Sequence, residues 1–215
     1  MRKNDLFIAS TLERLFPEAK TALRFHNPFE CICAVMLSAQ TTDEAVNRVT
    51  PRLFLVFPTP QAMAEAEIKD VEDIIKSIGL YHNKAANLVA MSKILVEKYD
   101  GSIPGNKEEL VALPGVGIKT ANVVGAECFH IPAIAVDTHV ARVAKRLGYA
   151  KENDSPETVE AILEKRFPTD MHIRLHHRLI HFGRFICHAR NPECHRCPFT
   201  EVCSYFKKTS SIKGK

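Results

Sequence analysis

Apolar residues recur along most of the chain at helical spacing. One helical face carries Leu6, Leu12, Leu15 and Phe16, and residues 29–37 form a buried helical run. Further helical patterns cover residues 43–53, 71–78, 84–99, 121–129, 138–147 and 171–186. No sustained strand alternation occurs, and the short β-like run at 134–136 is interpreted as a connector. The pattern predicts an all-α fold.

Several ends of these helices carry local signals. Asp43 is expected to cap the helix that follows it, and Pro51 to perturb the end of that helix. Gly79 is expected to stop the helix of residues 71–78. Ser155 followed by Pro156 predicts another helix start, with serine as the N-cap and proline at the first helical position.

Length and composition fit a water-soluble protein. The 215 residues suffice for one large domain or two small ones, and 46% hydrophobic with 25% charged residues is ordinary for this class. The longest apolar run, residues 31–37, is too short to cross a bilayer, and the N-terminus has no apolar signal region. We therefore expect a cytoplasmic protein, in which cysteines are free or metal-bound rather than paired in disulfides.

Positive charge gathers at the C-terminal end. Residues 171–215 hold nine Lys or Arg against Glu193 and Glu201, a net +7, whereas residues 1–170 carry −3. Six of the ten histidines also lie in this segment. Such an end is suited to contact phosphates, although charge alone fits a solvated helix face with a basic tail equally well.

Four of the seven cysteines form a cluster in the sequence, Cys187, Cys194, Cys197 and Cys203, spaced C-x6-C-x2-C-x5-C. Four thiolates so close together require a cation, and the single C-x2-C pair is unlike the two pairs of a usual zinc site. The spacing favours a [4Fe–4S] cluster over zinc or free thiols, with His195 as a minor alternative ligand. We expect the cluster to be structural and to present basic residues of its loop to phosphate. The other three, Cys31, Cys33 and Cys128, are expected to be small buried residues.

The segment 113–117, LPGVG, predicts a tight hairpin between two helices. Its glycines and the first amides of the next helix form a candidate phosphate site, although a plain αα-turn is the alternative. Lys119 lies at the start of that helix, where the positive end of the dipole favours a neutral amine nucleophile; it is otherwise a surface lysine. Asp137 is either a carboxylate that stabilises developing positive charge or only an N-cap.

Taken together, these motifs resemble the endonuclease III family of helix-hairpin-helix DNA glycosylases. The resemblance covers nearly the whole chain and rests on the segments 37–43 (LSAQTTD), 78–85 (IGLYHNKA), 113–124 (LPGVGIKTANVV), 135–148 (AVDTHVARVAKRLG), 181–187 (HFGRFIC) and the cysteine spacing. It implies two helical lobes with a DNA-binding groove between them: a six-helix lobe at 21–131, and a second lobe at 1–20 plus 132–215 with the cluster loop at 187–203.

The resemblance also implies a mechanism on a flipped-out nucleotide. Lys119 would attack the sugar C1′ of an oxidised pyrimidine nucleotide and expel the base, and β-elimination would then cut the strand 3′ to the abasic site, with Asp137 assisting base loss. Gln40 would fill the vacated space and Leu80 would wedge into the stack, although a polar helix end and a core leucine are the plain alternatives. Further DNA contacts are expected at Gly115, Val116, Gly117, His139, Arg142, Arg184, His188, Arg190 and Arg196.

One residue departs from the family pattern, and two other functions remain open. The residue before the lysine is often Arg in the family, but it is Ile118 here, which could weaken phosphate binding or raise the pKa of the amine. A monofunctional adenine or mismatch glycosylase would generally lack Lys119. A non-catalytic DNA-binding or iron–sulfur redox module would make Lys119 and Asp137 coincidental. We expect a monomer that acts on double-stranded DNA with damaged bases or abasic sites, without a membrane partner, in the cytoplasm or at a prokaryotic nucleoid.

Overall fold

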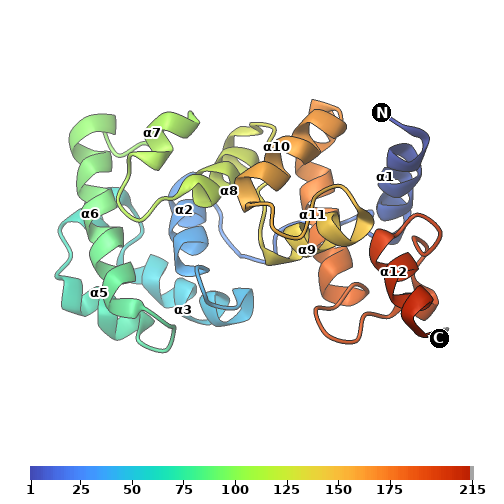
Figure 1. Ribbon diagram of the computed structural model, residues 1–215. Coiled ribbons are helices and arrows are strands. Elements are labelled where there is room, and N and C mark those ends of the chain that lie inside the picture. The colour runs from blue at the N-terminus through green and yellow to red at the C-terminus, as the bar shows by residue number, and fades with distance from the viewer. Residues whose placement is uncertain (214–215) are drawn as a thin grey trace. The chain divides into compact units, whose positions relative to one another are not determined.

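The computed structural model describes residues 1–213, and all regular structure in them is helical (Figure 1). No strand occurs among these residues, so the all-α prediction is confirmed. The segment 134–136 is a connector, with Ile134 and Val136 buried. The chain divides into two compact units, Thr21–Ile131 and Met1–Lys20 together with Pro132–Lys215.

The unit of residues 21–131 contains seven α-helices, all within the described part of the chain. They are α2 (Pro28–Leu37), α3 (Asp43–Val56), α4 (Pro60–Ala64), α5 (Ile68–Ile75), α6 (Tyr81–Tyr99), α7 (Lys107–Val111) and α8 (Ile118–Phe129). The resemblance implied six helices for this range. The structure has one more, and the two shortest of the seven, α4 and α7, have five residues each.

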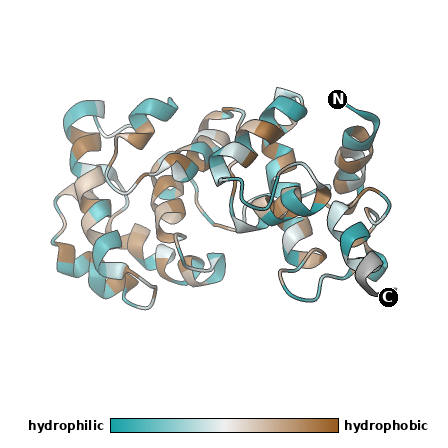
Figure 2. Cartoon of the chain, viewed as in Figure 1, coloured by the Kyte–Doolittle hydropathy of each residue, from teal (hydrophilic) through white to brown (hydrophobic). Residues whose placement is uncertain are grey.

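Helix α2 forms the centre of this unit. Every residue from Cys31 to Leu37 is buried, and α2 packs against α3, α6 and α8. From Cys31 on, this helix is apolar on all sides, and such a helix is stable only when other helices surround it, which explains the buried run predicted at 29–37 (Figure 2). Cys31 and Cys33 are fully buried as expected, whereas Cys128 is half-buried.

The second unit combines the N-terminal helix with the C-terminal part of the chain. Its elements are α1 (Lys3–Leu15), α9 (Thr138–Leu147), α10 (Pro156–Arg166), the 3-10 turn η1 (Thr169–Met171), α11 (His172–Phe185), the 3-10 turn η2 (Cys194–Arg196) and α12 (Ser204–Lys213). Helix α9 packs against α10, α11 and α12. Phe182 and Phe199 meet in the core with ring centroids 5.0 Å apart.

Two ion pairs fasten α1 to helices more than a hundred residues later in the chain. The Asp5 carboxylate, almost fully buried, accepts a hydrogen bond of 2.8 Å from Arg166 Nε on α10. Arg178 Nη2 on α11 donates to Glu13 Oε1 at 2.8 Å. Because a buried carboxylate without a partner is costly, these pairs specify where α1 docks.

The helix ends differ from three expectations. Thr42, not Asp43, caps α3, because its hydroxyl reaches the amide of Ala45 (3.2 Å) and leaves Asp43 in the first turn. Helix α3 also continues past Pro51 to Val56. Helix α5 ends at Ile75, four residues before Gly79, because residues 76–80 form turns that lead into α6.

Candidate active site and cysteine loop

The glycine hairpin between α7 and α8 packs closely on the core of its unit. Gly115 has φ +76°, and a Cβ there would lie 2.8 Å from Met36 Cε and 2.9 Å from Asn87 Cβ. Only glycine fits both the conformation and the space. Gly117 is different: it is the N-cap of α8 with φ −86°, and a Cβ there would meet nothing within 4 Å. The space beside Gly117 is therefore open.

Backbone amides at the start of α8 face this open space. The amides of the first helical turn, residues 118–120, have no acceptor inside the helix, and they lie at the positive end of its dipole. Val116 does not contribute, since its side chain is buried and its amide donates to Leu113 O at 3.1 Å. The DNA contact expected of Val116 is therefore not supported, because it is a core residue of the hairpin.

Lys119 is the second residue of α8 and is exposed. Within the described residues of its own unit, no acidic side chain pairs with its ammonium. Its neighbour Ile118 is 47% exposed, so an apolar side chain and not a cation lies beside the lysine. An exposed amine next to free amides is well placed to act on a group that the amides hold.

Asp137, in the other unit, is the N-cap of α9. Its Oδ1 accepts hydrogen bonds of 2.8 Å from the amides of His139 and Val140. The N-cap interpretation is therefore confirmed, but it does not exclude a catalytic role. Both amides use the same oxygen, and among the described residues no donor reaches Oδ2, so one carboxylate oxygen stays available.

His139 and Arg142 follow Asp137 on α9 and form part of its support. His139 Nδ1 lies 3.1 Å from Arg142 Nη2, and burial, followed by the nearby guanidinium groups of Arg142 and Arg184, holds the pKa of His139 below its usual value despite Asp137. Arg142 donates to Cys187 O (3.0 Å) and Gly183 O (2.8 Å). Its guanidinium thus fastens α9 to the end of α11, and the DNA contact expected of Arg142 is not supported.

Gln40 and Leu80 lie in turns with unusual backbone conformations. Gln40 follows α2 with φ 53°, and Leu80 is the N-cap of α6 with φ 59°. Both side chains are exposed, Leu80 by 52%. The alternative of a core leucine at position 80 is therefore wrong. Left-handed backbone at non-glycine residues costs free energy and is concentrated at functional sites.

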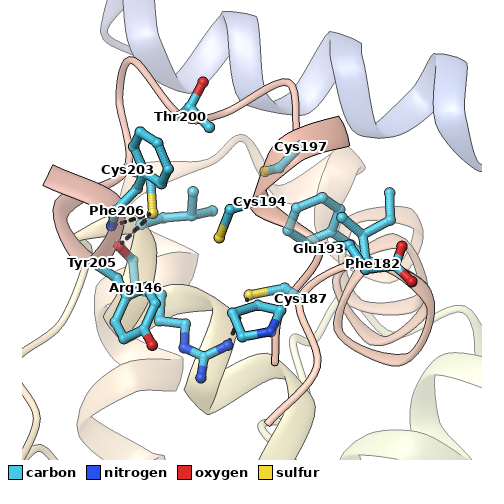
Figure 3. A pocket seen from close by; sticks show the side chains of 13 residues that line it. Arg146, Phe182, Cys187, Glu193, Cys194, Cys197, Thr200, Cys203, Tyr205 and Phe206 are labelled. Carbon is cyan, nitrogen blue, oxygen red and sulfur yellow. Dashed lines mark hydrogen bonds between the residues drawn. The ribbon is translucent and has the colours of Figure 1, made fainter. Parts of the chain in front are cut away.

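The four clustered cysteines face one cavity of the second unit (Figure 3). Cys187 follows the end of α11, Cys194 begins η2, Cys197 follows η2, and Cys203 precedes α12. Leu147, Phe182, Ile186, Pro192 and Phe206 also line the cavity. Apolar walls around four sulfur atoms match the chemistry of a thiolate-ligated cluster.

Hydrogen bonds to sulfur support the same assignment. Arg146 Nη1 lies 3.3 Å from Cys187 Sγ, and the amides of Phe199 and Phe206 donate to Cys197 Sγ (3.5 Å) and Cys203 Sγ (3.4 Å). Such donors stabilise thiolate ligands.

Two of the thiols resist ionisation in the protein alone. Burial is the main cause, and it raises the pKa of Cys194 above its usual value and the pKa of Cys197 to about 11. Bound iron would stabilise the thiolates. In residues 1–213, no three His, Cys, Asp or Glu side chains gather as ligands of a single metal ion.

The basic residues of the cysteine loop differ in whether their side chains are paired with other groups of the protein. Arg190 is exposed, and no ion-pair partner for it occurs among the described residues. Arg196 pairs with Glu193 and donates to Phe185 O (2.7 Å), and His188 Nε2 lies 3.7 Å from Glu193 Oε1. Arg190 is therefore the loop cation best able to meet a phosphate.

Two supporting residues, Arg146 and Lys84, escaped the sequence interpretation. Arg146 holds the cysteine loop through His188 O (2.6 Å) and Ala189 O (3.0 Å), besides its contact with Cys187. Lys84 is buried beneath the turn of Gln40 and reaches Thr41. A lysine within the apolar pattern of residues 84–99 is the one signal that could have indicated Lys84.

Two protein-family models match this chain, one over the hairpin region and one over the cysteine loop. A model of the HhH-GPD superfamily of base excision DNA repair proteins matches residues 33–169, which include the hairpin, Lys119 and Asp137. A model of the iron–sulfur binding domain of endonuclease III matches residues 187–203, which begin and end at clustered cysteines.

Individual relatives are similar over almost their whole length. The chain is 47% identical to endonuclease III of Bacillus subtilis over 92% of this chain and 90% of that protein. It is 44% identical to endonuclease III of Escherichia coli K12 over 94% of this chain and 96% of that protein. A solved structure of a trapped endonuclease III–DNA covalent intermediate superposes with a TM-score of 0.93 at 44% identity, covering 98% of this chain and 99% of that one.

The chain therefore belongs to the HhH-GPD superfamily of base excision DNA repair proteins and, within it, to the endonuclease III family. It is a DNA N-glycosylase with abasic-site lyase activity, it carries a [4Fe–4S] cluster, and its partner is DNA. The alternatives of a monofunctional glycosylase and a non-catalytic module are set aside. No helix in residues 1–213 has the length and apolarity needed to cross a membrane.

The two hairpin glycines give a matched pair of variants. Gly115→Ala should destabilise the protein by more than about 1 kcal/mol, because it adds a left-handed penalty and a clash with α2 and α6. Gly117→Ala should leave stability almost unchanged but weaken duplex binding, since its methyl group enters the open space beside the amides. Chemical denaturation and titration of labelled duplex measure the two effects, and equal stability of both variants would contradict the hairpin geometry.

Arg146 should determine how firmly the cysteine loop is held. Arg146→Met removes donors to Cys187 Sγ and two carbonyls, so we expect a loss of about 1–3 kcal/mol and a lower iron content after purification. Lys145→Met, at the next position, removes only a bond to Glu152 O and is the control. Iron analysis and thermal unfolding that did not distinguish the two variants would refute this role.

Proposed function

We propose that Lys119 is the nucleophile of both steps. Its neutral amine forms a bond to the sugar C1′ while the bond from C1′ to the base breaks, and the base leaves with that electron pair and gains a proton. Opening of the sugar gives a Schiff base at Lys119. Loss of a 2′ proton then breaks the C3′–O bond, so the strand is cut 3′ to the abasic site.

The observation that carries this proposal is the position of Lys119. Its amine is exposed in the first turn of α8, beside amides that are suited to hold a phosphate. Binding of a neighbouring phosphate at the amides would fix the sugar relative to the amine, and such positioning lowers the barrier of a bimolecular attack. The exposed Ile118 adds no cation here, so the phosphate hold depends on backbone groups.

We assign to Asp137 the stabilisation of positive charge on the sugar as the base leaves. The cap fixes the carboxylate through Oδ1, and Oδ2 remains available for the substrate. His139 lies beside it with a lowered pKa, so a neutral imidazole adds no competing positive charge near neutral pH. His139 is therefore proposed to line the active site.

The proposed substrate is duplex DNA with an oxidised pyrimidine or an abasic site. Gln40 would occupy the space of the flipped nucleotide, and Leu80 would wedge into the stack. Phosphate contacts are assigned to the backbone amides of Gly115 and Gly117 and to the basic side chains of Arg184, His188, Arg190 and Arg196. A panel of duplexes with one defined lesion each tests the substrate class, and faster excision of oxidised purines than of thymine glycol would overturn it.

The cluster is proposed to have a structural role, with Cys187, Cys194, Cys197 and Cys203 as its ligands. Thiolate ligation would hold the loop that presents Arg190 and Arg196.

We further propose that the protein acts as a monomer in the cytoplasm, at the nucleoid if the cell is prokaryotic. Size-exclusion chromatography with light scattering tests the first point, and a dimer at micromolar concentration would contradict it.

Replacement of Lys119 should abolish catalysis while DNA binding persists. Lys119→Ala should lower incision of an abasic-site duplex by about 10³-fold or more, because it removes the amine proposed to form the Schiff base. Lys98→Ala, an exposed lysine on α6, should act like the wild type. Single-turnover incision measured on gels, with duplex affinity in parallel, makes the comparison. Retention of incision by Lys119→Ala would exclude it as the nucleophile.

Replacement of Asp137 should distinguish the effect of its negative charge from its role as the N-cap of α9. Asparagine caps helices as well as aspartate does, so Asp137→Asn should change stability by less than about 1 kcal/mol. Excision of thymine glycol should nevertheless fall by about a hundredfold, whereas incision of a preformed abasic site, which needs no base loss, should fall less. Equal loss on both substrates would assign Asp137 to a step after base release.

A further inference from the structure

Lys84 is a buried cation that the proposed mechanism does not use. Only 6% of the residue is exposed, and burial lowers the pKa of its ammonium. Lys84 Nζ donates to Leu37 O at 2.9 Å and to Thr41 Oγ1 at 2.8 Å. A buried ammonium is costly unless its donors are satisfied, so these two bonds account for its presence in the core.

Both acceptors belong to the turn that carries Gln40. Leu37 ends α2, where carbonyl groups have no partner within the helix. Thr41 follows Gln40 directly, and its amide donates to Ser38 O at 3.1 Å. The ammonium therefore joins the two ends of the turn and holds Gln40 between them.

The same lysine is also fixed to the turn that carries Leu80. Lys84 lies in the first turn of α6, and its amide donates to the carbonyl of Leu80 at 3.0 Å. The two turns are neighbours, since a Cβ on Gly79 would lie 3.9 Å from Gln40 O. Lys84 is thus bonded to both turns, through its side chain to one and through its backbone to the other.

Both turns need such support. Gln40 and Leu80 have φ values of 53° and 59°, and non-glycine residues keep this conformation only where the surroundings determine it. Their side chains are exposed, so packing of Gln40 and Leu80 themselves contributes little. The left-handed conformations of the two turns are therefore held mainly by the hydrogen bonds beneath them.

We propose that Lys84 is a positioning residue that holds Gln40 and Leu80 as one rigid element for insertion into the DNA stack. It touches neither DNA nor the reacting atoms, and it acts through the two turns. The inference rests on the proposed function in one respect, namely that Gln40 and Leu80 enter the duplex. A rigid pair enters the stack without first being ordered, so its effect is on opening the duplex rather than on the chemistry at Lys119.

The test compares two substrates that differ in whether a stack must be opened. Lys84→Met keeps length and removes the ammonium, and Lys93→Met, at an exposed position of α6, is the control. Lys84→Met should slow excision of thymine glycol from a duplex by about ten- to a hundredfold. Incision of an abasic site in single-stranded DNA should stay within about twofold of the wild type. Hydrogen exchange at the amide of Thr41 should become faster in Lys84→Met and not in Lys93→Met.

A second pair of variants decides the matter if Lys84→Met fails to fold. Thr41→Val removes one acceptor and keeps the side-chain shape, whereas Thr41→Ser restores the hydroxyl. Valine should reproduce the duplex-specific loss in part, and serine should rescue it. Equal losses on both substrates, or exchange at Thr41 that no variant alters, would overturn the positioning role.

Gln40→Ala separates this proposal from the function on which it rests. Normal duplex excision by Lys84→Met with impaired excision by Gln40→Ala would overturn the positioning role alone. Normal excision by Lys84→Met, Gln40→Ala and Leu80→Ala would overturn the proposed insertion of Gln40 and Leu80 into the duplex. The positioning role of Lys84 would then be overturned as well. A duplex-specific loss in all three variants is the result that we expect.

Discussion

The site of residues 21–131 depends on one close backbone contact. At Gly115 the chain approaches Met36 of α2 and Asn87 of α6 more closely than any side chain would allow. This contact fixes where α8 begins, and thereby the direction of its free amides and of Lys119. The same two helices support the remaining elements, because α2 ends in the turn of Gln40 and α6 starts at Leu80. A change in how α2 meets α6 would thus move the hairpin and both turns together.

The second unit is organised around α9. Its N-terminus presents Asp137, whereas Arg142 and Arg146 further along the helix donate to carbonyl groups of residues 183–189. One helix therefore connects the carboxylate to the cysteine loop. This connection supports the proposed structural role of the cluster. Loss of the loop at 187–203 would leave the Arg146 guanidinium without its carbonyl acceptors, would remove one acceptor of Arg142 and would disturb the helix that Asp137 caps.

Sequence alone predicted the features that depend on local patterns. The apolar run at 29–37, the glycines of the hairpin and the cysteine spacing each carry their signal within a few residues. The features that it missed depend on contacts between distant segments. Lys84 looks like a surface lysine until α2 is placed beside α6, and Arg142 resembles a DNA-binding cation until its acceptors near Cys187 are known. The cap of α3 was misassigned because Thr42 and Asp43 are both good caps, and only geometry decides between them.

In the proposed mechanism, the hairpin places Lys119, and no other amine, at the sugar. Borohydride reduction of the protein mixed with an abasic-site duplex, followed by digestion and mass spectrometry, locates the amine that forms the Schiff base. We expect a sugar adduct on the peptide that contains Lys119. An adduct confined to another lysine or to the N-terminal amine would contradict it.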